Sequence, residues 1–462
     1  MSSILVENGS SRGLLRTSAP LMLSFLATFL MLFVDRLCLA NYSITAHNAA
    51  VNAGMVAWTL TFGLQTLTEM SEIFVAQYNG AGEYKQLGRP VWQMLWVTLA
   101  LTPLMVLIGH FGGPFVFDMS APGYEEKVVY FRLLLYFGPL YGVLGSLLAF
   151  FVGQGRTRVV TVVAVLGNLV NITLDPLFIF GFEGWVEPMG IAGAAIATGL
   201  GMLVQVIALL GYFLRPVHIQ DLGAGEWRPE WKRMWSYLKV TSPSSLMAML
   251  EMGGWSMFYA LMAQVSELHI LMAGICQDFV ILLLFFGVGL HKGVASVTGN
   301  LIGAKQHEHI SGVLRQACQY CLAFAASFTV LCLVFPKQIL GVMLKHALES
   351  GEIQGMMTRE EFWQLGFLCL LLSCLYLVID YLRMMYCAVL GAAGDTNFLL
   401  FSGISAIWLF LIVPTYYAVV LKGGSVQLAI AIWSSYALLH LAIEIWRFRS
   451  GVWAKKDLLS TG

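Results

Sequence analysis

Charged side chains are scarce in this sequence. Asp, Glu, Lys and Arg make up 11% of the 462 residues, whereas soluble domains have about 25%. Hydrophobic residues make up 58%. Acidic and basic residues number 26 each, so there is no basic surplus of the kind that attracts nucleic acid. The composition predicts a polytopic membrane protein with no nucleic-acid partner.

Motifs of catalysis and metal binding are also missing. The eight cysteines lack the paired spacing of a metal site or a disulfide scaffold, so we expect small buried hydrophobic side chains. There is no phosphate-binding glycine loop, no HExxH pair and no Ser/His arrangement. We therefore expect no catalytic residue and no cofactor. Three histidines without metal-like neighbours are expected at the membrane interface: His47, His269 and His440.

Apolar stretches long enough to cross a bilayer, which takes about 20 residues, recur along the chain. Twelve are predicted, near 17–40, 50–77, 91–112, 129–152, 158–181, 190–214, 237–263, 268–301, 313–335, 362–390, 397–421 and 427–448. Lys and Arg concentrate in alternate loops, which marks those loops as cytoplasmic. The polar N-terminus has no basic region before a short apolar stretch, so no cleaved signal peptide is expected. We predict a plasma-membrane protein (inner membrane in a bacterium) with both termini in the cytoplasm.

The two halves of the sequence resemble each other. Residues 74–93 are similar to 296–316, and the offset between Gly80 and Gly303 in their Gly-Ala turns equals that between Pro20 and Pro243. A polar insertion at 345–364 lengthens the second half. Six helices per half make the halves parallel in topology, an architecture of transporters that bind substrate between the halves. We predict an amino-terminal lobe, a cytoplasmic linker, a carboxyl-terminal lobe and a cytoplasmic tail, at 1–214, 215–236, 237–448 and 449–462.

Four motifs, in order, resemble those of the multidrug and toxic compound extrusion (MATE) transporters, and the resemblance covers nearly the whole chain. They are "APLMLSFLATFLMLFVD", "AQYNGAG", "GNLVNITLDPLFIFG" followed by "GIAGAAIAT", and "AVLGAAGDT". The resemblance implies an all-α membrane protein with twelve transmembrane helices in two pseudo-symmetric six-helix lobes around a central cleft. It also implies export of organic compounds in exchange for H⁺ or Na⁺.

The stretch "NITLDPLFIFG" (171–181) places polar residues in an apolar helix. Asn171 and Asp175 are four residues apart and share one face, and Pro176 frees the carbonyl of Ile172. A carboxylate at membrane depth costs about 3 kcal/mol or more, so it marks a functional site by default; an Asp bonded to a neighbouring Ser or backbone amide is the alternative. The resemblance implies a coupling-ion site of Asp35, Asn171, Asp175 and Thr198, in which Na⁺, if it is the coupling ion, would bind Asp35, Asn171 and Asp175.

Acidic residues of the second half form another candidate site. Glu251 and Asp380 resemble the acidic residues of the sodium-coupled branch of the family, and Gln277 is placed at or near the cleft. A solvated cleft wall that binds cationic substrate is the alternative for the two carboxylates. Asp278 is expected to serve Arg383 as an ion partner. Because both acidic sets are present, the choice between H⁺ and Na⁺ stays open.

Three charged residues form a candidate gate. Glu69 and Glu72 share a face near the cytoplasmic end of the second span, and the offset between the repeats places Glu69 on Lys292. We predict that Lys292 pairs with Glu69 or Glu72 when the transporter faces outward and separates from them when it faces inward. The alternative is that Lys292 extends to the lipid headgroups and water wets the glutamates.

The predicted function is secondary antiport of cationic or amphiphilic compounds by a monomer. One alternative is a lipid-linked precursor flippase of the same superfamily. Such flippases have a basic cavity, whereas the charges expected within the membrane here are mostly acidic, which favours cationic cargo. An intramembrane enzyme and a passive channel are further alternatives. The sequence has no catalytic motif for such an enzyme, and a channel would not need two lobes of six helices each.

Overall fold

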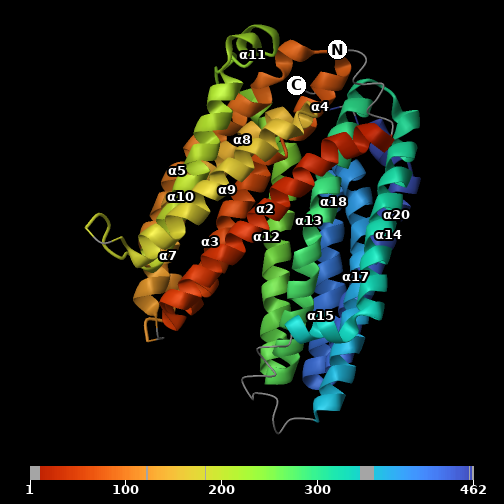
Figure 1. Cartoon of the computed structure of the whole chain (residues 1–462). Coiled ribbons are helices and arrows are strands. Elements are labelled where there is room, and N and C mark those ends of the chain that lie inside the picture. The colour runs from red at the N-terminus through yellow and green to blue at the C-terminus, as the bar shows by residue number, and fades with distance from the viewer. Residues whose placement is uncertain (1–10, 121–122, 183, 344–357, 457, 460–462) are drawn as a thin grey trace.

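Residues 11–120, 123–182, 184–343, 358–456 and 458–459 are described by the computed structural model, and nearly all of them lie in helices (Figure 1). The amino-terminal half contains α2 (Ser11–Tyr42), α3 (Ile44–Glu69), α4 (Glu72–Ala81), α5 (Gly88–Phe111), α6 (Gly113–Val116), α7 (Tyr124–Tyr136), α8 (Gly138–Gly153), α9 (Thr157–Phe180), α10 (Ile191–Phe213) and α11 (Pro216–Asp221). The carboxyl-terminal half contains α12 (Trp231–Val265), α13 (Glu267–Gly303), α14 (Ile310–Val334), α15 (Pro336–Met343), α17 (Arg359–Ala392), α18 (Thr396–Ser405), α19 (Val413–Thr415) and α20 (Val426–Arg449). The π-helical segment Ala406–Ile412 joins α18 to α19, and a second one, Tyr416–Leu421, continues the same helix beyond α19.

The predicted spans correspond to these helices. Eleven helical stretches of the described chain are long and apolar enough to cross a membrane. The predicted second span consists of α3 and α4, which are separated by a break at Met70 and Ser71. The predicted fourth span is also divided, into α7 and α8, because Pro139 lacks the amide hydrogen that would continue the first helix. Most of the polar insertion at 345–364 lies outside the described residues.

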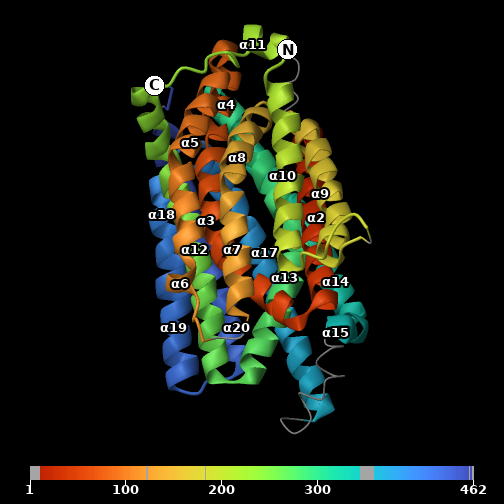
Figure 2. The same ribbon diagram turned by 90° about the vertical axis from the view of Figure 1, so that its left-hand side faces the viewer.

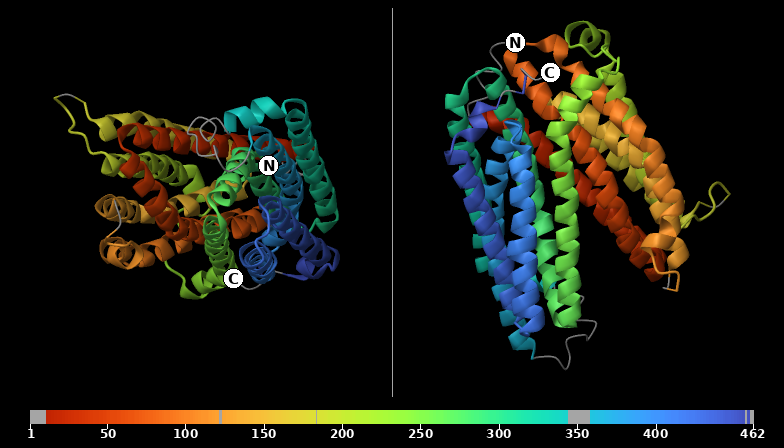
Figure 3. Two further views of the ribbon diagram at one scale, coloured as in Figure 1. Left: turned by 90° about the horizontal axis from the view of Figure 1, so that it is seen from below. Right: turned by 180° about the vertical axis from the view of Figure 1, so that it is seen from behind.

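The helices form two lobes that meet at one end of the molecule (Figures 1 and 3). That end, called the terminal end below, carries both termini and α11, and the lobes diverge toward the opposite, far end. In the side view of Figure 2 the helices run roughly parallel. The first helix of each half contacts the other half: α2 packs on α13, and α12 packs on α3. The architecture is therefore the predicted two-lobe arrangement, with α2 and α12 as the elements shared between lobes.

The linker at the terminal end is docked on α5 rather than free. The indole of Trp92 donates a hydrogen bond of 2.7 Å to the Ala224 carbonyl. The side chain of Gln93 donates to the Arg228 carbonyl and accepts from the Glu230 amide, both at 2.9 Å. Because these bonds use backbone groups of the linker, they fix its path from α11 to the start of α12.

Candidate functional site

A cluster of buried polar side chains, called the pocket below, lies in the amino-terminal lobe between α9 and α10. Asn171 and Asp175 on α9 are 1% and 0% exposed. The Asn171 amide nitrogen is 3.3 Å from an Asp175 carboxylate oxygen and 3.3 Å from the Thr198 hydroxyl of α10. Turning that amide over would give bonds of 3.2 Å to Asp175 and 3.1 Å from the Thr198 amide. The structure thus brings together three of the four residues predicted for the coupling-ion site.

Asp35 on α2 lies within electrostatic range of Asp175. Its side chain is buried, and Oδ1 has no hydrogen-bond partner among the described residues. It lies close enough to Asp175 for the two negative charges to act on each other. Two neighbouring carboxylates in a buried site resist joint ionisation unless a cation joins them. The pocket can therefore hold a proton or a small cation with oxygen ligands.

The sequence interpretation missed other polar residues near the pocket. Tyr130 on α7 and Tyr141 on α8 lie within reach of the Asp35 charge. Asn168 on α9 donates a 3.2 Å hydrogen bond to the Thr28 hydroxyl of α2. Asn168 precedes Asn171 by three residues, a helical spacing that could have identified it. The tyrosines carry no such signal, because aromatic residues are frequent throughout these apolar helices.

The second predicted site contains a buried ion pair. On α17, the Arg383 guanidinium is 2.7 Å from the Asp380 carboxylate, and both residues are buried. The prediction that Asp278 pairs with Arg383 is wrong. Asp380 is one helical turn from Arg383 and needs no contact between helices, whereas Asp278 is exposed on α13 and the basic residue whose charge acts on it is Arg36 of α2.

The remaining predicted residues of this site are less closely joined. Glu251 on α12 is half-buried, and the cationic side chain that acts on it most strongly is Arg383. In the described part of the chain, Gln277 forms no hydrogen bond to Glu251 or Asp380. The expectation of His440 at the membrane interface is wrong, because His440 is 3% exposed inside this lobe. The group is therefore a charged cluster in the lobe interior, with Asp380 already neutralised by a guanidinium.

The three residues of the candidate gate meet at the boundary between the lobes. Lys292 Nζ lies 3.0 Å from a Glu69 oxygen and 3.3 Å from a Glu72 oxygen. The two glutamates do not share a face of one helix, since Glu69 ends α3 and Glu72 begins α4. At the break between these helices, the Ser71 hydroxyl donates a hydrogen bond of 2.6 Å to the Thr68 carbonyl. The break lets both carboxylates reach one ammonium group. Opening and closing by this cluster stays a prediction.

At the terminal end, two glycines related by the repeat each pack against a backbone carbonyl of the opposite lobe. A Cβ atom on Gly80 would overlap the Asn300 carbonyl, and a Cβ on Gly303 would overlap the Gln77 carbonyl. Gln77 and Asn300 are related by the same sequence offset as the two glycines. Their side chains donate equivalent 2.9 Å hydrogen bonds across the boundary, from Gln77 to the Ala392 carbonyl and from Asn300 to the Gly153 carbonyl. The internal repeat thus produces a nearly two-fold symmetric contact between lobes.

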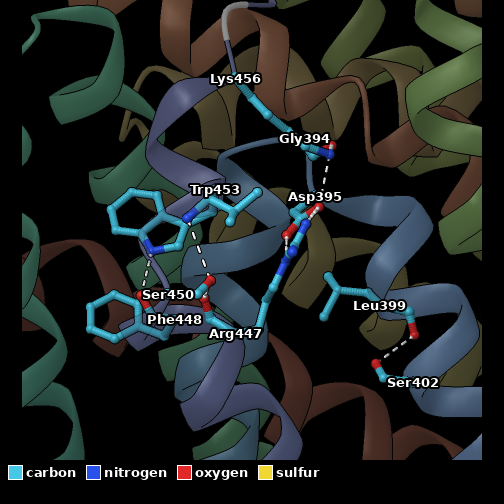
Figure 4. A network of polar contacts seen from close by, with 10 residues as sticks. Gly394, Asp395, Leu399, Ser402, Arg447, Phe448, Ser450, Trp453 and Lys456 are labelled. Atoms are coloured by element: carbon cyan, nitrogen blue, oxygen red, sulfur yellow. Dashed lines mark hydrogen bonds and ion pairs between the residues drawn. The ribbon is translucent and has the colours of Figure 1, made fainter.

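The tail after α20 is fixed at the same end (Figure 4). The Asp395 carboxylate is 2.7 Å from Arg447 Nε, which donates a hydrogen bond to it, and 2.7 Å from the Lys456 ammonium, with which it forms an ion pair. Lys456 also donates a hydrogen bond of 3.2 Å to the Gly394 carbonyl. Leu458 packs on Gly394 of the carboxyl-terminal lobe and on the hydrophobic core of the amino-terminal lobe. The tail therefore bridges the two lobes; we name Lys456 and Leu458 the strap.

Removing the Asp395 charge should loosen the strap. Burial alone would raise the pKa of Asp395, but hydrogen bonds from Arg447 and Lys456 outweigh it and hold the pKa below its usual range. A lowered folded-state pKa stabilises the fold above the unfolded value of about 3.9 and loses that effect as pH falls further. Asp395→Asn should cost about 2 kcal/mol at neutral pH, with a lower melting temperature in detergent that converges with wild type at acidic pH. Asp118→Asn, at an exposed carboxylate bonded only to Ser120 among the described residues, should change little.

The comparisons with known proteins agree with this architecture. The MatE family model matches residues 20–177 and 243–417, so its two segments begin at the two equivalent prolines of the repeat. The probable multidrug resistance protein NorM of Thermotoga maritima is 25% identical over 341 residues, 71% of each chain. The multidrug resistance protein MdtK of Edwardsiella ictaluri is 24% identical over 425 residues, 89% of this chain and 88% of that protein.

Solved structures share the fold. A crystal structure of MATE in the straight conformation aligns with a TM-score of 0.83 at 18% identity, over 98% of this chain and 99% of that one. An outward-facing multidrug resistance MATE family transporter aligns with a TM-score of 0.81 at 18% identity, over 96% of each chain. At this level of identity the likeness is one of fold: twelve transmembrane helices in two lobes.

Proposed function

The chain belongs to the MATE family of transporters, and on that basis we propose that it is a secondary antiporter that exports cationic or amphiphilic organic compounds in exchange for H⁺ or Na⁺. It is a multi-pass membrane transporter and not an enzyme. The relatives named as multidrug resistance proteins support drug or toxin export. A small-molecule substrate is the partner that this function requires.

One observation carries the proposal: the buried pocket of Asp35, Asn171, Asp175 and Thr198. Asp175 is fully buried, and Asp35 has a carboxylate oxygen without a hydrogen-bond partner among the described residues. Such groups are costly within a membrane unless a proton or cation joins them. Reversible occupation of the pocket by the driving ion would therefore change the charge of the lobe by one unit. We infer that this change is what couples the ion to transport.

The first helix offers a route from the pocket to the boundary between lobes. One end of α2 carries Asp35, and the other packs on α13 of the opposite lobe, where Gly289 and Gly293 leave room for Met22 and Ser18. A shift of α2 upon ion binding would therefore change how the lobes pack. Figure 1 shows α2 crossing from one lobe to the other. We propose that this shift favours the state that releases substrate outward.

The described state fits an outward-facing conformation under the proposed topology. The terminal end carries the basic loops expected in the cytoplasm. It is closed by Lys292 and the two glycine contacts, while the lobes diverge at the far end. Rocking of the lobes about the boundary would then expose the site alternately to the two sides.

Purified protein in liposomes tests this function. Imposed H⁺ or Na⁺ gradients should drive uptake of members of a panel of cationic compounds, and neutral compounds serve for comparison. Asp175→Asn should reduce gradient-driven uptake at least about tenfold, because the fixed charge that binds the ion is lost. Thr173→Val, on the exposed face of the same helix, is the matched control. Uptake by wild type that needs no gradient would contradict antiport, and full activity of Asp175→Asn would contradict the site.

A further inference from the structure

A stripe of polar and aromatic side chains follows one buried face of α20. Trp433, Tyr436, His440, Glu444 and Arg447 recur at intervals of three and four residues, so they share one face of the helix. The first four are at most 3% exposed. Arg447 ends the stripe at the terminal end, where it binds Asp395 (Figure 4). The stripe thus connects the interior of the carboxyl-terminal lobe to that end.

The centre of the stripe is a carboxylate without a donor. Glu444 is 0% exposed, and neither of its oxygens has a hydrogen-bond partner among the described residues. His440 Nε2 lies 3.2 Å from Glu444 Oε1, but the two atoms are not hydrogen-bonded in the present orientation of the ring. A buried ionised carboxylate is costly unless it is paired or neutralised. A proton on Nε2, directed at Oε1 after rotation of the ring, would give these two atoms the hydrogen bond that they lack.

The charges around the pair also favour an added proton. Charged and titratable groups around it come from α12 (Glu251), α17 (Asp380, Arg383 and Cys387) and α20 itself (Tyr436 and Arg447), and Asp395, just before α18, binds Arg447. Arg383 is held by Asp380 at 2.7 Å. One guanidinium therefore serves the carboxylates of Glu251, Asp380 and Glu444, which leaves two negative charges without compensation. Charging His440 would cancel one of them.

We propose that His440 and Glu444 form a proton-binding site in the carboxyl-terminal lobe, separate from the Asp35–Asp175 pocket. The proton resides on His440 Nε2 and is donated to Glu444 Oε1. Glu444 precedes Arg447 by three residues, about 5 Å along the helix, so the site lies within one turn of the terminal end. A contribution to ion exchange rests on the proposed antiport; the binding of the proton does not.

Nuclear magnetic resonance of histidine-labelled protein in nanodiscs tests the site. His440→Gln identifies the His440 signal among the nine histidines. In wild type at neutral pH this signal should be that of an imidazolium, and Glu444→Gln should convert it to a neutral imidazole, with the charged fraction falling at least about tenfold. The control is Ser435→Ala on the exposed face of α20, which should leave the signal unchanged.

Two outcomes would overturn the proposal: a neutral His440 in wild type, or a charged His440 that ignores Glu444→Gln. If Glu444→Gln does not fold, the wild-type signal still decides. Glu444→Asp, which keeps the carboxylate, should then retain the imidazolium. Because the resonance requires no transport, failed gradient-driven uptake would contradict the proposed function and leave this site standing.

Discussion

Replacing Lys292 with methionine should open the terminal end of the transporter and reduce gradient-driven transport at least about tenfold. The ammonium lies 3.0 Å from Glu69 and 3.3 Å from Glu72, and the Glu72 side chain is 4% exposed. Its removal leaves two adjacent carboxylates without a cation, and breaking a buried ion pair costs about 3–5 kcal/mol. Because Lys292 and the glutamates belong to different lobes, that cost falls on the closed arrangement alone. Since each factor of ten in an equilibrium corresponds to about 1.4 kcal/mol, the cost exceeds a hundredfold shift in population.

A charge exchange separates a gate from a merely destabilised helix. The double variant Glu69→Lys with Lys292→Glu keeps two carboxylates and one ammonium at the boundary. It should recover much of the transport that each single reversal loses, and spin-label distances across the terminal end should return to the closed value. Lys305→Met, at an exposed lysine just beyond α13, is the control for lost charge. A double variant as inactive as the single ones would rule out the gate.

Adding one methyl group at Gly303 should have a comparable effect on transport without unfolding the protein. The new Cβ would overlap the Gln77 carbonyl, a backbone atom that cannot rotate away. Overpacking of this kind costs about 1–3 kcal/mol, and here the cost falls on closure because the carbonyl belongs to the other lobe. The helix itself should gain up to about 1 kcal/mol from alanine. Transport should therefore fall about 5- to 150-fold while the melting temperature holds or rises.

The repeat supplies a second version of this experiment and a control. In Gly80→Ala the new Cβ would overlap the Asn300 carbonyl of the symmetric contact, so this variant should lose transport as Gly303→Ala does. Neither glycine has a positive φ, so alanine is compatible with the backbone at both positions. Gly312→Ala on α14 has no atom within 4 Å of the new Cβ and should transport normally. A Gly303→Ala protein with normal transport and a closed terminal end would contradict the assigned contact.

Features that lie within one helix could be predicted from the sequence. The predicted spans follow from apolar length, except that the second, α3 and α4, is not among the eleven apolar stretches of the described chain. The polar pocket follows from Asn171 and Asp175 at a spacing of four residues. The same spacing rule could have revealed Asp380 with Arg383 and His440 with Glu444, which are three and four residues apart. Those pairs were missed because each residue was interpreted alone or against a partner on another helix.

Features that depend on packing between helices could not be read in this way. The electrostatic influence of Asp35 on Tyr130 and Tyr141 depends on the packing of α2, α7 and α8 around α3, which no periodicity encodes. The break at Ser71 is another case, since no proline or glycine marks it in "TLTEMSEIF". The internal repeat is the exception, because its constant offset places Glu69 on Lys292 and Gly80 on Gly303 across the molecule.

The strap has a consequence for how the protein is made. Lys456 and Leu458 follow the described spanning helices of both lobes, so a ribosome translates them after those helices. Until then the two lobes must be joined by α2, α12, the docked linker and the contacts that α3 and α4 make with α13. A nascent chain arrested after α20 should therefore contain both lobes but lack the bridge between them. Bridging of the terminal end by the strap would then be among the last steps of biogenesis, and a bulky fusion placed directly after Arg449 would interfere with that step rather than with insertion.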